Sequence, residues 1–450
     1  MKLDLPRETA LKILYEINKS GAYSNIALNK NLEDNKLNNL DRAFITELVY
    51  GTLKRKLTID YIIDQFSSVK IKKLSPWILN ILRLGVYQLV FMDKIPESAA
   101  CNESVNLAKR YGHSASSRYV NAVLRNVARS RDKIEYPDKN KDISTYLSIK
   151  YSHPEWMVKS WLIRFGESFT EELLKSNNET APLTVRINTL KTNREELQIE
   201  LRKEGFETEP ARYIKNALTI NNPTSITKME AYVKGLFQVQ DESSMMVAQV
   251  LDPKPGEFVI DVCSAPGGKA THIAELMQNK GEVIARDVHE HKIKLIKEAS
   301  ERLGIDIISS GIFDAIEQDF NLTGKADRVL VDAPCTGLGI IRRKPDIKWT
   351  RNANDLTEIV KLQEKILKSS SSYVKPGGVL VYSTCTIEPK ENEEQVNKFL
   401  QANREFELED ISQFIPEGLI KATAKEGYIQ LYTNTDGIDG FFISKMRKRS

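Results

Sequence analysis

Two of the four cysteines lie in short segments of small and polar residues, where a thiol could carry out chemistry. Cys335 lies in the segment DAPCTG, and Cys385 lies in the segment STCT. Both segments follow apolar stretches that are typical of strands, so both thiols are expected to face one crevice. A thiolate is a strong nucleophile, which makes the pair a candidate for covalent catalysis. Cys101 has no such neighbours, and we interpret it as a small buried apolar residue.

Acidic residues lie at the ends of successive predicted strands. They are Asp261, Asp287, Asp314 and Asp332. Ligands of an open α/β sheet bind beyond the carboxyl ends of its strands, and an acidic residue there can accept hydrogen bonds from ribose hydroxyls. A single aspartate at a strand end is a turn or cap residue about half the time. Four in succession are harder to explain as turns.

A loop of small residues follows the first of these strands. The sequence CSAPGGK over residues 263–269 places two glycines just before a predicted helix. Glycine lets the backbone approach a ligand closely, and a helix N-terminus favours negative charge. The pattern matches neither the phosphate-binding loop nor the dinucleotide-binding fingerprint.

The elements that must position these residues alternate between strand and helix from about residue 240. The predicted strands are 258–262, 282–285, 328–331 and 379–382, and the predicted helices are 269–277 and 291–303. This alternation is typical of a mostly parallel sheet with helices on both faces. Two further predicted strands, 427–432 and 440–444, have no helix between them. We expect them to close the edge of the sheet in antiparallel pairing.

The preceding part of the chain shows a different pattern. Apolar residues at helical spacing predict a bundle of five or more helices. The predicted helices are 7–18, 40–53, 77–91, 98–109 and 116–128. Residues 131–180 are polar and are predicted to form a linker followed by a short helical stretch. Strands at 183–187 and 217–220, with a helix at 192–204 between them, indicate a small α+β module.

Composition limits the class of protein. The 450 residues are 41% apolar and 28% charged, as in a soluble globular protein of roughly three domains, which excludes disordered and collagen-like chains. The net charge is +4, but residues 1–130 hold 20 Lys and Arg against 12 Asp and Glu, so the other 320 residues sum to −4. A basic N-terminal region could contact a polyanion, although a solvated basic face would show the same charge.

Cysteine usage and apolar runs indicate the compartment. Four dispersed cysteines predict neither a disulfide scaffold nor a structural zinc site, so no metal is expected. The N-terminus has no secretory signal, and the longest apolar stretch, residues 77–92, is too short and polar to span a bilayer. We expect a cytoplasmic protein without membrane contact.

Three segments carry a resemblance to a known family. DVCSAPGGK (261–269), DAPCTGLGIIRRKPDIKW (332–349) and STCT (383–386) resemble the motifs of the NOL1/NOP2/Sun family. Its members are S-adenosylmethionine-dependent RNA cytosine-C5 methyltransferases. The paired PC and TC motifs separate this family from ordinary Rossmann-type methyltransferases.

The helical region carries a second resemblance. LGVYQL (84–89), PESAA (96–100) and YVNAVLR (119–125) are similar to the RNA-binding NusB domain. A NusB-like domain joined to this catalytic domain resembles the RsmB type of the family. That type methylates one cytosine of bacterial 16S rRNA, numbered 967 in its name.

The resemblance implies roles for the candidate residues. Cys385 is implied to be the nucleophile that attacks carbon 6 of cytosine, and Cys335 to assist its release. Asp332 is implied to line the junction of cofactor and base, Asp287 to bind the ribose hydroxyls and Asp314 the adenine side. The residues implied to hold the methionine part of S-adenosylmethionine are Cys263, Ser264, Ala265, Pro266, Gly267, Gly268 and Lys269.

A basic run follows the PC motif. Arg342, Arg343 and Lys344 lie just beyond Cys335, and Lys348 follows them. Such a run is usually a solvated face. Beside a pocket for a nucleotide we expect it to contact phosphate.

These observations combine into one expectation. The chain is predicted to have a NusB-like all-α bundle at 1–135, a linker and small α+β module at 136–239, and a Rossmann-like class I methyltransferase domain at 240–450. It is expected to be a monomer that binds S-adenosylmethionine and small-subunit rRNA. Methylation of transfer RNA or of another rRNA site stays open, because a NusB-like domain argues against it only by analogy. So does a non-catalytic ribosome assembly factor, which would have no need of two thiols at one crevice.

Overall fold

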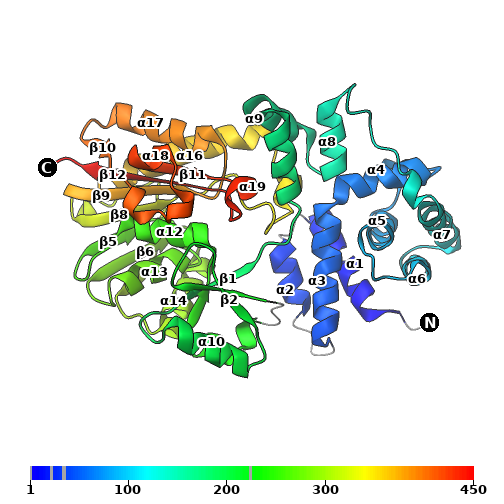
Figure 1. Cartoon of the computed structure of the whole chain (residues 1–450), viewed down its shortest axis with the longest axis horizontal. Helices are drawn as coiled ribbons and strands as arrows, with labels where there is room; N and C mark the ends of the chain where they lie inside the picture. The colour runs from blue at the N-terminus through cyan, green and yellow to red at the C-terminus, as the bar shows by residue number, and fades with distance from the viewer. Residues whose placement is uncertain (1–2, 21–23, 33–36, 222–225) are drawn as a thin grey trace. The chain divides into compact units, whose positions relative to one another are not determined.

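The chain forms two compact units (Figure 1). The computed structural model describes residues 3–20, 24–32, 37–221 and 226–450. The helical unit comprises residues 1–180 together with 341–351, and the sheet unit comprises residues 181–340 and 352–450. The division into three domains, at residues 1–135, 136–239 and 240–450, stays a prediction.

The predicted helical bundle is confirmed in the first unit. Its helices are α1 (Leu5–Ser20), α2 (Ser24–Leu32), α3 (Asn39–Lys54), α4 (Lys56–Phe66), α5 (Pro76–Phe91), α6 (Glu97–Tyr111) and α7 (Ser114–Arg129). Helix α5 begins as its sequence predicts: the Ser75 hydroxyl accepts from the Ile78 N–H, and Pro76 occupies the first helical position. The apolar sides of these helices form one core. Helices α2 and α4 had not been located from the sequence.

The predicted linker is largely helical, so that prediction was wrong in extent. Helix α8 (Ile143–Tyr151) and the 22-residue helix α9 (Glu155–Ser176) occupy most of residues 136–180. Both helices are polar on the exposed side and apolar on the other, and Trp161 and Leu174 of α9 are buried. Gly166, with φ +76, interrupts α9. A few apolar residues at helical spacing were enough to form both helices, because they pack within the helical unit.

The segment 341–351 packs within the helical unit and contains the short helix α15 (Ile347–Thr350). Lys348 is 1% exposed, and its ammonium donates to the Lys54 carbonyl at 2.8 Å and to Asn178 Oδ1 at 3.1 Å. Trp349 Nε1 donates to the Leu53 carbonyl at 2.9 Å. These bonds satisfy carbonyl oxygens at the end of α3 that have no partner inside the helix.

The predicted phosphate contact by Lys348 is therefore wrong. Burial lowers the pKa of this ammonium well below its ordinary value, and the neighbouring Arg55 and Lys54 lower it further. Arg342 is buried as well, whereas Lys344 is exposed. A run of four cations in the sequence thus divides between the interior and the surface.

The small α+β module is confirmed and belongs to the sheet unit. Its antiparallel strands lie in the order β2–β3–β1–β4. The strands are β1 (Leu183–Ile187), β2 (Thr208–Pro210), β3 (Ala217–Ile220) and β4 (Phe237–Val239), and the helices are α10 (Arg194–Lys203) and α11 (Glu230–Val233). Val185 and Ile187 of β1 pack with Leu197 and Leu201 of α10 in the module's own core.

The large sheet is mixed, as predicted. Its order is β10–β12–β9–β8–β5–β6–β7, and β11 pairs with β12. Strands β9, β8, β5, β6 and β7 are mutually parallel, and β12 is antiparallel to its three neighbours. The strands are β5 (Phe258–Asp261), β6 (Glu282–Asp287), β7 (Ile308–Ile312), β8 (Ala326–Asp332), β9 (Val374–Thr384), β10 (Phe406–Leu408), β11 (Tyr428–Leu431) and β12 (Phe441–Lys448).

Helices cover both faces of this sheet (Figure 1). The helices are α12 (Glu242–Leu251), α13 (Gly268–Leu276), α14 (Glu290–Leu303), α16 (Ala353–Ser371), α17 (Glu393–Ala402), α18 (Ala422–Lys425) and α19 (Thr433–Asp436). Strand residues alternate between two cores: Val259 and Leu330 pack with α12, α13 and α14, whereas Ile260 and Val331 pack with α16 and α17. Among the described residues, no helix has the length and apolar character needed to cross a bilayer.

Candidate functional site

Two thiols meet at the carboxyl ends of adjacent parallel strands. Cys335 follows β8, Cys385 follows β9, and their sulfur atoms are 3.1 Å apart. The register of β8 and β9 pairs Asp332 with Ser383, which brings the two loops to the same level. The two cysteines thus lie side by side, and the crevice that they were predicted to face stays a prediction.

The neighbouring sulfur and burial both act on the Cys335 thiol. The hydrogen bond to the Cys385 sulfur and burial together raise the pKa of Cys335 well above its ordinary value. Cys335 therefore keeps its proton near neutral pH. A protonated thiol beside a second sulfur can donate a proton to it.

A buried carboxylate holds the loop that carries Cys335. Glu391 lies in a short 3₁₀ helix (Pro389–Glu391) and is fully buried. Its Oε2 accepts from the Thr336 N–H at 2.9 Å and from Gln363 Nε2 at 2.9 Å, and its Oε1 accepts from the Thr336 hydroxyl. Gln363 also donates to the Pro334 carbonyl at 2.9 Å. These hydrogen bonds fix Pro334 and Thr336, the residues on both sides of Cys335.

A neighbouring amide holds the loop that carries Cys385. Asn392 accepts from the Thr384 hydroxyl at 2.6 Å and donates to the Thr386 carbonyl at 3.1 Å. The hydroxyl oxygens of Thr336 and Thr386 lie 2.8 Å apart and join the two loops directly. Neither Glu391 nor Asn392 was predicted from the sequence. Glu391 contacts residues 28 and 55 positions away, and Asn392 contacts its own loop, so no motif marks either residue.

Asp332 forms the polar wall beside the thiols. Its Oδ2 accepts from the Lys269 ammonium at 2.7 Å, and its Oδ1 accepts from the Ser383 hydroxyl at 2.8 Å. Burial alone would lower the pKa of Lys269. The Asp332 carboxylate outweighs this effect of burial and holds the pKa of Lys269 above its ordinary value. Lys269 had been assigned to the cofactor loop. The structure additionally places its side chain on the predicted catalytic carboxylate.

The predicted cofactor loop runs from Cys263 to the start of α13. The Ser264 N–H donates to the Arg286 carbonyl at 2.8 Å, and the Gly267 N–H donates to the Ser264 carbonyl at 2.8 Å. Gly267 has φ +95, and a Cβ there would lie 3.2 Å from the Cα of Ile296. Both the backbone angle and the close helix α14 favour glycine at this position.

Carboxylates surround the first residue of this loop. Burial raises the pKa of Cys263 well above its ordinary value, and Asp261, Asp332 and Asp287 raise it further. The Asp287 carboxylate accepts from the His289 N–H at 3.1 Å and lies 3.4 Å from the Lys292 ammonium. Three of the four predicted strand-end aspartates thus act on one thiol.

Asp314 and Asp261, two of the four strand-end aspartates, differ in their surroundings. Asp314 is exposed and accepts from the Ile316 N–H at 3.1 Å within its own turn. Asp261 is fully buried; burial, reinforced by Asp332, raises its pKa to about 7. Asp261 was not among the predicted site residues, although its place at the end of the first parallel strand was a usable signal.

Together these residues suit a covalent reaction on a bound ligand. Two sulfur atoms and a carboxylate–ammonium pair lie at the carboxyl end of a parallel sheet, next to a glycine-containing loop at a helix N-terminus. Ligands of open α/β sheets bind at this edge. The cluster of carboxylates around Cys263 favours a ligand group with positive charge.

Comparison with known protein families assigns a description to each part of the chain. Residues 248–447 match the family described as 16S rRNA methyltransferase RsmB/F. Residues 4–129 match the NusB family. Residues 153–227 match a ferredoxin-like domain described as Methyltr_RsmF/B-like.

Similar proteins extend over the whole chain. A probable ribosomal RNA small subunit methyltransferase B of Bacillus subtilis is 40% identical over 100% of both chains, and one of Synechocystis sp. is 36% identical over 98% of this chain and 99% of its own. Among solved structures, that of PH0851 matches 100% of both chains with a TM-score of 0.83 and 29% identity. The crystal structure of NSun6 from Pyrococcus horikoshii with SFG covers 66% of this chain and 98% of its own, with a TM-score of 0.59 and 25% identity.

The buried Asp261 makes a prediction about pH. Its folded-state pKa of about 7 lies above the ordinary value of 3.8, so the folded protein keeps a proton that the unfolded chain loses. Its contribution to stability is therefore undiminished below pH 4 and is lost as the pH rises towards 7 and above. We expect Asp261→Asn to gain up to about 4 kcal/mol in unfolding free energy over the wild type between pH 4 and pH 8.

Denaturant unfolding of both proteins across this pH range measures the effect. Asp93→Asn is the matched control, because the Asp93 side chain is 91% exposed and its neutralisation is expected to leave the pH profile unchanged. Parallel profiles for wild type and Asp261→Asn would show that the Asp261 carboxyl titrates normally.

Proposed function

We propose that this chain, which belongs to the RsmB/F family of 16S rRNA methyltransferases and carries a NusB domain, transfers a methyl group from S-adenosylmethionine to carbon 5 of one cytosine in small-subunit rRNA. By the resemblance of its motifs, that cytosine is the one numbered 967. The observation that carries the proposal is the pair of sulfur atoms of Cys335 and Cys385, 3.1 Å apart beside Asp332. Carbon 5 of cytosine is a poor nucleophile, and a thiol that adds to carbon 6 makes it a better one.

The first part of the proposal concerns the cofactor. S-adenosylmethionine would supply an activated methyl group. The loop 263–268 would hold its methionine part, and the partly exposed Ala265 and exposed Pro266 leave this loop accessible. The carboxylates of Asp287 and Asp332 suit the positive charges of such a cofactor. Asp287 would accept from the ribose hydroxyls, and Asp314 would contact the adenine side. The solved structure of NSun6 from Pyrococcus horikoshii with SFG supports a cofactor site in this fold.

The second part assigns the two cysteines. The Cys385 thiolate adds to carbon 6 of cytosine, which moves electron density onto carbon 5 and makes that carbon nucleophilic. After methyl transfer, which leaves S-adenosylhomocysteine, a solvent water takes the proton on carbon 5. The electron pair of that C–H bond re-forms the C5–C6 double bond and expels the Cys385 sulfur from carbon 6. Cys335, whose sulfur lies 3.1 Å from that of Cys385, gives its proton to the departing sulfur and so assists release. The assignment of the two roles follows the resemblance of the TC and PC motifs.

Asp332 is the third catalytic residue of the proposal. Its two oxygens accept hydrogen bonds from Lys269 and Ser383, and each oxygen keeps a further acceptor position. The carboxylate would accept from the amino side of cytosine and favour the N3-protonated form of the ring. Lys269 holds it in place from the cofactor loop, so the base and the cofactor are positioned by one ion pair.

The substrate class follows from the N-terminal region. Residues 1–130 carry a net charge of +8, and residues 4–129 match the NusB family. Positive charge attracts RNA through its phosphates without reading the sequence. The target cytosine must be unpaired or extruded before a thiol can reach carbon 6. The helical region would thus supply affinity for RNA, and the sheet unit would carry out the reaction.

Transfer of a radiolabelled methyl group from S-adenosylmethionine to unmethylated 16S rRNA tests the function. We expect label at a single cytosine, located by bisulfite sequencing. Label on transfer RNA or at another rRNA position would change the substrate but keep the reaction. No label on rRNA, on transfer RNA or on intact ribosomal particles would favour a non-catalytic assembly factor.

Removal of the proposed nucleophile is the second test. Cys385→Ala is expected to abolish methyl transfer, by at least about 10³-fold, because it removes the thiol to which the proposal assigns the bond to carbon 6. Its affinity for S-adenosylhomocysteine should stay within about twofold of the wild type. Cys101→Ala is the matched control, since Cys101 is buried in the helical unit and should leave the rate unchanged. Full turnover by Cys385→Ala would place the nucleophile elsewhere.

Removal of the second thiol should have a different outcome. Cys335→Ala is expected to form the adduct but to release it slowly, so a covalent protein–RNA complex should accumulate. Denaturing gel electrophoresis with labelled RNA detects it as a slowly migrating band. A covalent band with Cys385→Ala instead of Cys335→Ala would reverse the two assignments.

A further inference from the structure

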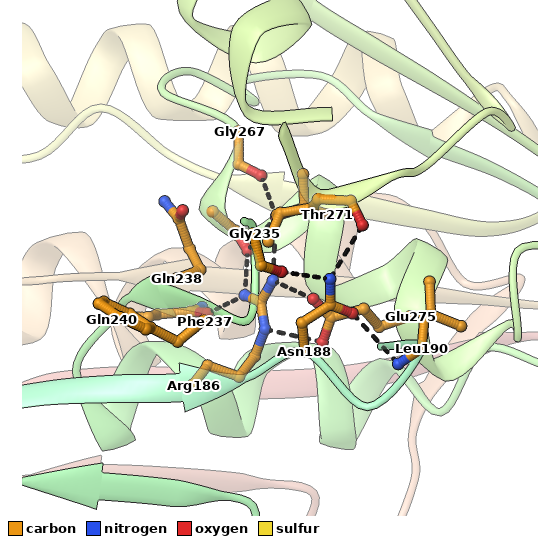
Figure 2. A network of polar contacts seen from close by, with 12 residues as sticks. Arg186, Asn188, Leu190, Gly235, Phe237, Gln238, Gln240, Gly267, Thr271 and Glu275 are labelled. Carbon is orange, nitrogen blue, oxygen red and sulfur yellow. Dashed lines mark hydrogen bonds and ion pairs between the residues drawn. The ribbon is translucent and has the colours of Figure 1, made fainter. Parts of the chain in front are cut away.

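A buried ion pair joins the small α+β module to the helix that follows the cofactor loop (Figure 2). Arg186 lies on β1, and Glu275 lies on α13. The Arg186 Nε donates to Glu275 Oε2 at 3.0 Å and its Nη2 donates to Glu275 Oε1 at 2.7 Å. Both side chains are 2% exposed. The alternation of β1 explains the placement: Val185 and Ile187 enter the module's own core, so Arg186 points the other way.

Every donor of this guanidinium has a partner. Besides the two bonds to Glu275, the Nη1 group donates to the Gly268 carbonyl at 2.7 Å and to Gln240 Oε1, and Nη2 donates to the Thr271 hydroxyl at 3.1 Å. Arginine has five N–H donors in a fixed planar arrangement, and all five are used here. A buried charge is tolerated in such a place only when it is paired and fully hydrogen-bonded.

Two of these contacts reach the cofactor loop itself. Gly268 is the first residue of α13, and its carbonyl accepts directly from Arg186. Thr271, which accepts from Arg186, donates to the Gly267 carbonyl at 2.8 Å. Figure 2 shows Thr271 between the guanidinium and Gly267. These hydrogen bonds fix the two glycines of the loop through their carbonyl groups and do not involve their N–H groups.

The module is also attached to the next helix, but without contact to the loop. Asn188 donates to the Leu303 carbonyl at 2.9 Å, at the end of α14. The Lys191 ammonium donates to the Arg302 carbonyl at 2.8 Å and to the Lys234 carbonyl at 3.0 Å. These bonds fasten the module generally, whereas the Arg186 contacts reach the loop.

We propose that Arg186 is a positioning residue for S-adenosylmethionine: the small module sets the backbone of Gly267 and Gly268 through this guanidinium, and Glu275 holds the guanidinium in place. The role of the module is therefore to set cofactor affinity. This inference rests on the proposed function of the loop.

The test needs a variant that keeps the fold. Arg186→Met alone leaves the Glu275 charge buried without a partner, which is strongly destabilising. The double variant Arg186→Met, Glu275→Leu replaces the ion pair by apolar side chains of similar size, an exchange that proteins often tolerate. Lys191→Met is the matched control, because it removes bonds from the same module to α14 and none to the loop. Circular dichroism and thermal unfolding establish that each variant is folded.

Calorimetric titration with S-adenosylhomocysteine is the main measurement. We expect the double variant to bind at least 10-fold more weakly than the wild type, and Lys191→Met to bind within twofold of it. Arg186→Lys should be intermediate, since lysine supplies three donors and no planar fork. In methyl-transfer assays the double variant should show a raised KM for S-adenosylmethionine, an unchanged KM for RNA and a kcat within about threefold of the wild type. A merely structural loss would instead lower the active fraction and leave KM unchanged.

Two outcomes overturn the inference. One is a folded double variant whose affinity for S-adenosylhomocysteine is within twofold of the wild type. The other is an equal loss in Lys191→Met, which would show general loosening of the module. If the wild type itself binds no S-adenosylhomocysteine, the proposed function of the loop fails. Hydrogen exchange of residues 263–269 then decides the positioning role separately: faster exchange in the double variant alone supports it, and equal exchange in all proteins refutes it.

Discussion

The parallel pairing of β8 with β9 is the constraint on which the site depends. It places Asp332 opposite Ser383, so the two loops that follow carry Cys335 and Cys385 to a sulfur–sulfur distance of 3.1 Å. These cysteines are 50 positions apart in the chain, so their meeting depends on the pairing of the strands that precede them. The strand register decides where the two loops begin, and the buried Glu391 then fixes the loop that carries Cys335 relative to the loop that carries Cys385. A shift of register by one residue would turn these side chains to the opposite face.

Buried charge recurs around this edge and is compensated in different ways. Lys269 is neutralised by Asp332, and Arg186 by Glu275. Glu391 is instead surrounded by neutral donors, and burial raises its pKa. Each group loses hydration on folding, so each is stable only with its partners in place. The same condition makes the arrangement specific, because a displaced loop would leave a buried polar group unsatisfied.

Most of the elements were predictable, and the failures share a cause. Strands β5 and β8 are short apolar runs, and α5 begins with an N-cap and proline, so local signals located them. The helices α8 and α9 were predicted only as a linker and a short helical stretch, because their surfaces are polar. The strand before Asp314, β7, was given no bounds, because Ser309, Ser310 and Gly311 interrupt its apolar pattern. The basic run after the PC motif predicted a phosphate contact by Lys348, but the Lys348 ammonium instead donates to a carbonyl oxygen inside the helical unit.

By itself the sequence determined the chemical groups and their order: two cysteines in distinct motifs, aspartates at strand ends, a glycine-containing loop and a basic N-terminal region. Local spacing carries this information, because strands, caps and turns depend on neighbouring residues. Only the tertiary structure decided which groups meet. It paired Lys269 with Asp332, brought the Cys335 and Cys385 sulfurs together, placed Glu391 against the PC loop and linked Arg186 to the cofactor loop. Those outcomes depend on burial and on contacts between residues distant in the chain, which no local pattern encodes.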